Sequence, residues 1–214
     1  MNPKGIIKLR ESASNFDAVS QKLFNLANKL EEQPEYNIYS ALDSINRQAE
    51  TATVDIRNAI GRVAPEVRQS YHDGTNDALS ISITESNAWI KITLPGIVPH
   101  RKARDNAAFL TRPMRNALIQ YQRQHPMERF RDCAICIVHQ YDEALGAKRI
   151  HDYDNVETKR YLDVIESVFL TNDTGLLCTI LQTTQMGDRD ATFFYLMPPF
   201  RLKEWVENDS LRDT

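Results

Sequence analysis

The hydrophobic period of this chain changes near Leu79, and this change constrains the fold more than any single motif. Before that point, apolar residues recur every three or four positions, which is typical of amphipathic helices. After it, apolar and polar residues alternate, as they do in strands with one buried face. We therefore expect a helical hairpin arm over residues 1–75 and a separate α/β domain over residues 76–214.

The arm is predicted to be two antiparallel helices that share a narrow apolar seam. The first helix includes Phe16 to Leu30 and the second includes Ile38 to Ile56, with residues 31–37 as the turn. Pro65 fits the first turn of a short third helix that ends near Gly74. Two interpretations of the seam are open: it serves dimerisation or partner binding, or the arm simply packs on its own core.

The second domain is expected to be a mixed α/β domain, with a sheet and with helices on one side of it. Its first two strands form a hairpin, and residues 186–188 join its last two strands. The elements follow the order β-β-α-β-α-β-β and end with a closing helix, over residues 79–84, 88–94, 111–125, 132–140, 156–168, 176–183, 191–197 and 201–207.

Composition indicates a protein that stays inside the cell. No apolar run reaches the roughly 18 residues that span a bilayer, and the first residues lack the apolar core of a secretory signal. We therefore expect a cytoplasmic protein with no membrane partner. Cys133 and Cys136 have the spacing of a zinc pair, but on a strand these positions point to opposite faces. Buried core cysteines are the favoured interpretation.

Basic residues gather in the middle of a chain whose net charge is −3. Residues 101–131 contain eight Lys or Arg against two acids, which is a local charge of +6. Such a patch can attract a polyanion, although a solvated helix face has the same pattern. The candidate nucleic-acid-binding residues are Arg101, Lys102, Arg104, Arg112, Arg115 and Arg123.

Acidic residues gather after the strand predicted over 132–140. Asp152 and Asp154 are one residue apart, and Asp173 follows in a later turn. Carboxylates arranged in this way hold Mg²⁺ against a phosphate, because hard cations prefer oxygen ligands. Each acid also has a plain interpretation: Asp154 as a helix N-cap three residues before Glu157, Asp173 as a turn residue, and Asp152 as a solvated side chain.

At this point the sequence resembles the RusA-type Holliday-junction resolvases. The resemblance lies in Asp152-x-Asp154-Asn155, Lys159, Asp163 and Asp173, and in Ile92-Thr93-Leu94-Pro95-Gly96 before a basic loop. It covers roughly residues 88–197, and the lysine comes one residue later than is usual in that family, with Thr158 in its place. Asn172 stands where the family tends to have another Asp.

The resemblance implies a homodimeric endodeoxyribonuclease, of phage or mobile-element type, that depends on Mg²⁺ or Mn²⁺ and cuts branched DNA. Asp152, Asp154 and Asp173 would then bind the metal, and Lys159 would be the catalytic lysine.

Other chemistries lack their motifs. The chain has no glycine-rich nucleotide loop and no G-x-S-x-G elbow, and of its five histidines only His151 adjoins the acids. Two alternatives to the nuclease stay open. One is a catalytically inactive protein of the same fold that binds nucleic acid through the basic segment, and the other is an interaction protein that acts through the helical arm.

Overall fold

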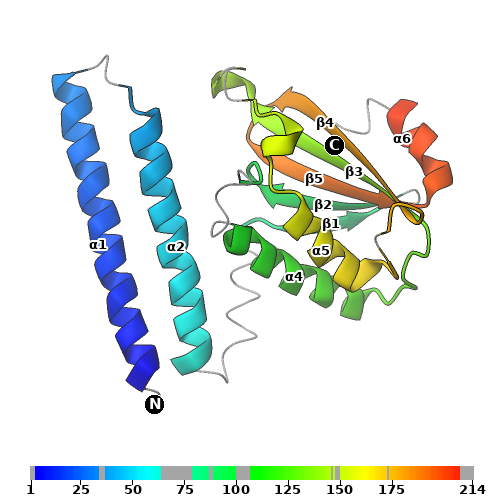
Figure 1. Cartoon of the computed structure of the whole chain (residues 1–214), viewed down its shortest axis with the longest axis horizontal. Coiled ribbons are helices and arrows are strands. Elements are labelled where there is room, and N and C mark those ends of the chain that lie inside the picture. The colour runs from blue at the N-terminus through cyan, green and yellow to red at the C-terminus, as the bar shows by residue number, and fades with distance from the viewer. Residues whose placement is uncertain are drawn as a thin grey trace. The chain divides into compact units, whose positions relative to one another are not determined.

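The computed structural model describes residues 3–33, 37–63, 79–86, 89–99, 107–145, 147, 150–172 and 174–207 (Figure 1). The chain divides into two compact units, Met1–Tyr71 and His72–Thr214. The short third helix expected between Pro65 and Gly74 lies outside the described residues. Among the helices that the structure describes, none combines the length and the apolar character that crossing a membrane requires.

The first unit is the expected pair of helices, α1 (Pro3–Glu32) and α2 (Tyr39–Val63), which run antiparallel beside each other (Figure 1). Val19 and Leu26 of α1 and Ile45 of α2 form the buried seam, which extends to Ala52 of α2. α1 begins well before Phe16, because residues 3–15 continue the helix with a mostly exposed surface. The narrow seam leaves most described residues of α1 exposed to solvent.

The second unit is a five-stranded mixed sheet with helices packed on it, which confirms the expected fold class. The strand order is β1-β2-β5-β3-β4, and every neighbouring pair is antiparallel except β3 with β4. Its elements are β1 (Ser82–Glu85), β2 (Ile90–Pro95), α4 (Ala107–Gln124), β3 (Cys133–Asp142), η2 (Glu143–Leu145), η4 (Tyr153–Asn155), α5 (Lys159–Phe169), β4 (Cys178–Gly187), β5 (Ala191–Met197), η5 (Pro199–Arg201) and α6 (Leu202–Glu207).

The last two long strands are connected in sequence but are not neighbours in the sheet. Residues 188–190 cross the end of β3, so that β3 lies between β4 and β5 (Figure 1). The crossing is fixed by side chains: the Asp142 amide donates to the Asp190 carboxylate at 2.9 Å, and Gln140 donates to the Arg189 carbonyl at 3.1 Å. A short turn such as 186–188 suggests a hairpin, whereas the partner of each strand is decided by tertiary packing.

The two faces of the sheet have separate cores. On one face, Ile92, Ile135 and Ile137 pack against Met114 of α4 and Ile165 of α5. On the other face, Trp205 of α6 packs against Tyr195, with ring centroids 5.4 Å apart. The expectation that all helices lie on one side of the sheet is therefore wrong for α6. This helix is held by Trp205, an apolar side chain that could pack on either face of the sheet.

The cysteines are core residues, as predicted. Cys133 belongs to the core beneath α4 and α5, whereas Cys136 belongs to the core beneath α6. Neither cysteine is in a disulfide, and burial raises the pKa of Cys133 to about 12. A protonated thiol is a poor metal ligand and nucleophile, which agrees with a structural role.

Candidate functional site

The acidic loop, residues 150–158, lies over the sheet face that α4 and α5 cover, near the ends of β3 and β4. Tyr153 anchors it there: its ring stacks on His139 with centroids 5.9 Å apart, and its hydroxyl is 3.1 Å from Thr184 Oγ1. The His151 amide donates to the Tyr141 hydroxyl at 3.2 Å. Ligands of parallel α/β sheets commonly bind near the carboxyl ends of strands, and β3 and β4 are the parallel pair.

Asp152 and Asp154 flank Tyr153, and both are exposed. Asp152 precedes the 3-10 turn η4 without a capping hydrogen bond from its side chain. Among the residues that the structure describes, no three His, Cys, Asp or Glu side chains form a group that could hold a metal ion. Two exposed carboxylates one residue apart can still recruit a hydrated cation through water.

Asp154 is not the N-cap of the helix that follows, so this interpretation is wrong. α5 begins at Lys159, and Thr158 occupies the N-cap position. The side chain that serves the helix start is Glu157, whose Oε1 accepts from the Arg160 amide at 3.3 Å. Helix was expected from Val156 onwards, but residues 156–158 are not helical, because the loop first passes over the sheet through the 3-10 turn η4.

Asp173 lies outside the described residues, but its neighbours are placed. The Thr174 carbonyl accepts hydrogen bonds from the Leu177 and Cys178 amides, at 2.8 and 2.9 Å. Cys178 is the first residue of β4. Tyr153 contacts Thr184 on the same strand, six residues further along, and at about 3.3 Å per residue this separation is roughly 20 Å. The described neighbours of Asp173 thus lie at the opposite end of β4 from the acidic loop.

Lys159 is the first residue of α5, and its Nζ donates to Asp163 Oδ1 at 2.7 Å. Both side chains are exposed, so this ion pair contributes under about 1 kcal/mol and does not fix the lysine. The retained spacing of four residues between Lys159 and Asp163 is accounted for by this contact alone.

His139 was not singled out by its sequence pattern. It lies on β3 with 1% of its surface exposed, and within the described part of the chain its Nδ1 has no hydrogen-bond partner. Its Nε2 is 3.5 Å from Gln182 Oε1. Burial lowers the pKa of His139, so the imidazole is neutral at pH 7. It supports the acidic loop from below through Tyr153.

The second candidate surface is the outer side of α4, which we call the basic helix. Met114 and Leu118 are fully buried, whereas Arg112, Arg115 and Arg123 are exposed, as predicted. The helix contains no Asp or Glu. Arg101, Lys102 and Arg104 precede it and lie outside the described residues, so their role stays a prediction.

The arginines of the basic helix differ from Arg129, which follows the helix, in their contacts. Arg129 donates to the carbonyls of Ser167 and Leu170, at 2.9 and 3.3 Å, and so satisfies the end of α5. In contrast, neither Arg115 nor Arg123 forms an ion pair with any described residue. These two guanidinium groups are available to an anion from outside.

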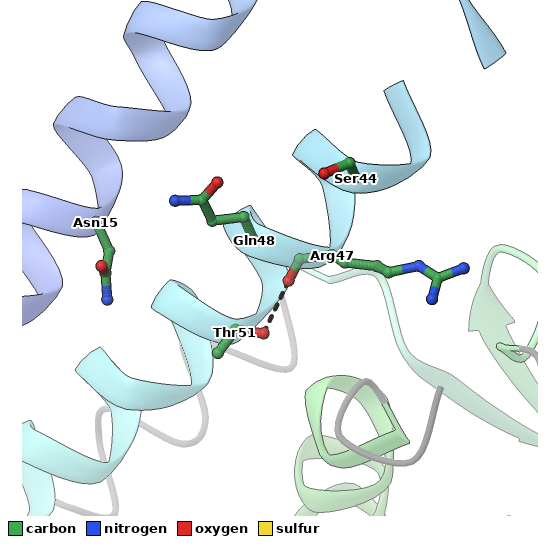
Figure 2. Close-up of a pocket in the computed structure, with 5 residues that line it drawn as sticks. All are labelled: Asn15, Ser44, Arg47, Gln48 and Thr51. Carbon is green, nitrogen blue, oxygen red and sulfur yellow. Dashed lines mark hydrogen bonds between the residues drawn. The ribbon is translucent and has the colours of Figure 1, made fainter. Parts of the chain in front are cut away.

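The helical hairpin has a hollow of about 550 Å³ along its surface, lined by Asn15, Ser44, Arg47, Gln48 and Thr51 (Figure 2). The Thr51 hydroxyl donates to the Arg47 carbonyl of its own helix at 2.8 Å, and the Arg47 side chain extends away from α1 (Figure 2). The described lining offers two amides, two hydroxyls and the Arg47 guanidinium, which are groups that bind polar ligands.

Comparison with known proteins supplies a family. A family model described as "Family of unknown function (DUF6100)" matches residues 5–214. The chain belongs to this family. Because the match includes the hairpin as well as the sheet, the arm is part of the family's own architecture and not an addition to it. No curated protein matches the chain.

Among solved structures, the chain is similar to the periplasmic domain of Helicobacter pylori MotB (residues 90–256). The identity is 8%, and the match covers 59% of this chain and 84% of that one, with a TM-score of 0.30. A similarity this weak carries neither fold nor function across.

Proposed function

We propose that this protein binds nucleic acid through the basic helix α4, and that it does so without cleaving it. The observation that supports the proposal is the charge of one helix side: three exposed arginines, no acid anywhere in the helix, and a fully buried opposite side. A helix of 18 residues is about 27 Å long, so its side can track several phosphates of one strand.

The electrostatic attraction of a polyanion is confined to the basic helix. The whole chain has a net charge of −3, so a polyanion is attracted only where the arginines gather. Each arginine that neutralises a phosphate releases counterions, which makes the affinity depend steeply on salt. DNA is the partner that the sequence resemblance suggests, and such a partner fits a cytoplasmic protein.

A Mg²⁺- or Mn²⁺-dependent endonuclease acting on branched DNA is the second candidate. It is favoured by the exposure of Asp152 and Asp154 on one short turn near the ends of two parallel strands. We rank it second because the described neighbours of Asp173 lie at the far end of β4. A shared ion would require all three carboxylates within about 5 Å of one another.

Fluorescence anisotropy with a labelled four-way junction in EDTA tests the binding proposal. The double variant Arg115→Gln, Arg123→Gln should bind about thirtyfold more weakly, because each of the two lost charged contacts removes about 1 kcal/mol or somewhat more. The control, Arg10→Gln with Lys203→Gln, removes the same charge from exposed positions of α1 and α6 and should bind like the wild type. Equal weakening in both variants would reject a specific basic helix.

Addition of Mg²⁺ or Mn²⁺ to the same complex separates the two candidates. The proposal expects the junction to stay intact in either metal. Nicking by the wild type that Asp152→Asn and Asp154→Asn abolish, with folding unchanged, would replace the binding proposal with the endonuclease.

We also propose that the protein is a homodimer assembled through its hairpin. Phe16 and Leu23 of α1 are 36% and 46% exposed and lie one heptad apart beside the buried seam. Two helices alone enclose a thin core, whereas two hairpins can form a four-helix bundle that buries this second stripe. The first 71 residues have nine basic and nine acidic side chains, so charge repulsion does not oppose the association.

A further inference from the structure

We propose that the sheet face opposite α4 and α5 contains a binding site for a small phosphorylated molecule. This inference goes beyond nucleic-acid binding and depends on different residues. α6 covers the part of this face near the end of β5, where Trp205 packs on Tyr195. Near the start of β5 the face is hollowed instead, with a volume of about 490 Å³, which is within the usual range for small-molecule sites.

The floor of this hollow presents hydroxyl and ammonium groups in register. In the β1–β2 pair, Thr84 lies directly opposite Lys91, and Ser82 lies directly opposite Thr93. Residues that oppose each other in this way point to the same face with Cβ atoms about 5 Å apart. Three hydroxyl groups and one ammonium group therefore form a compact block of donors, and all four residues line the hollow.

Two cations, Lys91 and Arg189, line this hollow. Lys91 Nζ lies 4.6 Å from the centroid of the Phe193 ring, which holds the ammonium over the sheet by a cation–π contact. Arg189 lines the hollow from the β4–β5 crossing. The pKa of Lys91 is lowered by burial and, to a smaller extent, by the charge of Arg189, so the two cations repel each other. An anion between them would remove this repulsion.

Hydrogen bonds hold the segment that carries Arg189 at the side of the hollow. The Gln140 amide donates to the Arg189 carbonyl at 3.1 Å, and Gln185 donates to Gln140 Oε1 at 2.8 Å. Gly187 leaves room for this arrangement, since a Cβ atom there would lie 2.4 Å from the Gln140 side chain. The backbone at Arg189 is therefore held by a hydrogen bond from a buried side chain.

The donors indicate the kind of anion. Asp188 also lines the hollow, so with Lys91 and Arg189 the formal charge of the lining is +1. The hydroxyls, the ammonium and the guanidinium together match the three terminal oxygens of a phosphate monoester better than the two oxygens of a carboxylate. The remaining volume accommodates an organic group attached to that phosphate.

Isothermal titration with phenyl phosphate and with inorganic phosphate tests the site. Saturable binding of both by the wild type is expected, and Arg189→Gln and Lys91→Gln should each weaken it about tenfold, the effect of one charged hydrogen bond. Arg10→Gln, which removes the same charge from an exposed position of α1, should leave it unchanged. Arg189 lies in an exposed turn, so its variant keeps the fold even if Lys91→Gln does not.

Two results would overturn the inference. One is the absence of saturable binding of either compound up to about 10 mM. The other is equal weakening by Arg10→Gln and Arg189→Gln, which would indicate diffuse charge attraction. A loss of DNA binding in Arg115→Gln, Arg123→Gln with phosphate binding retained would show that the two surfaces act independently.

Discussion

At the scale of single residues, His139 has the most constrained environment near the acidic loop. It is buried beneath Tyr153, and burial lowers its pKa from the ordinary value of 6.5. A neutral imidazole in the folded state becomes a charged one in the unfolded state when the pH is low. Protonation of His139 therefore favours unfolding, and with it release of the acidic loop.

The stability of the second unit should fall as the pH drops below 6.5, because the unfolded chain then binds a proton that folded His139 does not. Urea unfolding between about pH 7.5 and pH 5 measures this dependence. His139→Gln removes the titrating group and should flatten the decline. An identical decline in the variant would assign the pH dependence to other groups.

Gly187→Ala should destabilise the protein by about 1–3 kcal/mol, because the new methyl group would overlap the Gln140 side chain and force it from its hydrogen bonds. The matched control is Gly175→Ala, where a Cβ atom meets nothing within 4 Å. Chemical denaturation of both variants gives the comparison. Equal stability of the two variants would contradict the close packing at the β4–β5 crossing.

At the scale of elements, periodicity predicted the hairpin and each described strand and α-helix of the sheet domain, because burial on one face leaves a direct trace in sequence. The pairing of strands leaves no such trace in the sequence. β4 and β5 lie on either side of β3, although only three residues connect β4 to β5. The start of α5 at Lys159 was also missed. Asp154 and Glu157 have the spacing of a helix-capping pair, but Asp154 belongs to the 3-10 turn η4 instead. His139 escaped notice because its neighbour Tyr153 comes from the loop that folds over it.

Leu23→Glu on α1 should convert the dimer to a monomer, because it places a charge in the stripe that a second hairpin would bury. Light scattering coupled to size-exclusion chromatography measures the mass. Ser14→Glu, an exposed position on the opposite side of the same helix from Leu23, is the control and should remain dimeric. A wild-type monomer at all concentrations would exclude assembly through the hairpin.

At the scale of the whole molecule, the protein combines a hairpin with a sheet domain, and the family model extends over both. Its charge is divided between surfaces: the arginines of α4 on one, and the exposed Asp152 and Asp154 on the acidic loop. The sequence predicted both groups as candidates. It could not predict that the acidic loop would be held at the far end of β4 from the neighbours of Asp173, because this depends on the path of the chain across the sheet.

The salt dependence of DNA binding is the decisive test of the basic helix as a phosphate-binding surface. The logarithm of the binding constant for a four-way junction, plotted against the logarithm of the salt concentration in EDTA, should give a line whose slope reports the phosphates contacted. Arg115→Gln with Arg123→Gln should reduce the magnitude of the slope by about 1.8, at about 0.9 per contact, while Asp152→Asn with Asp154→Asn leaves it unchanged. An unchanged slope in the arginine variant, or no salt-dependent binding by the wild type, would contradict the account.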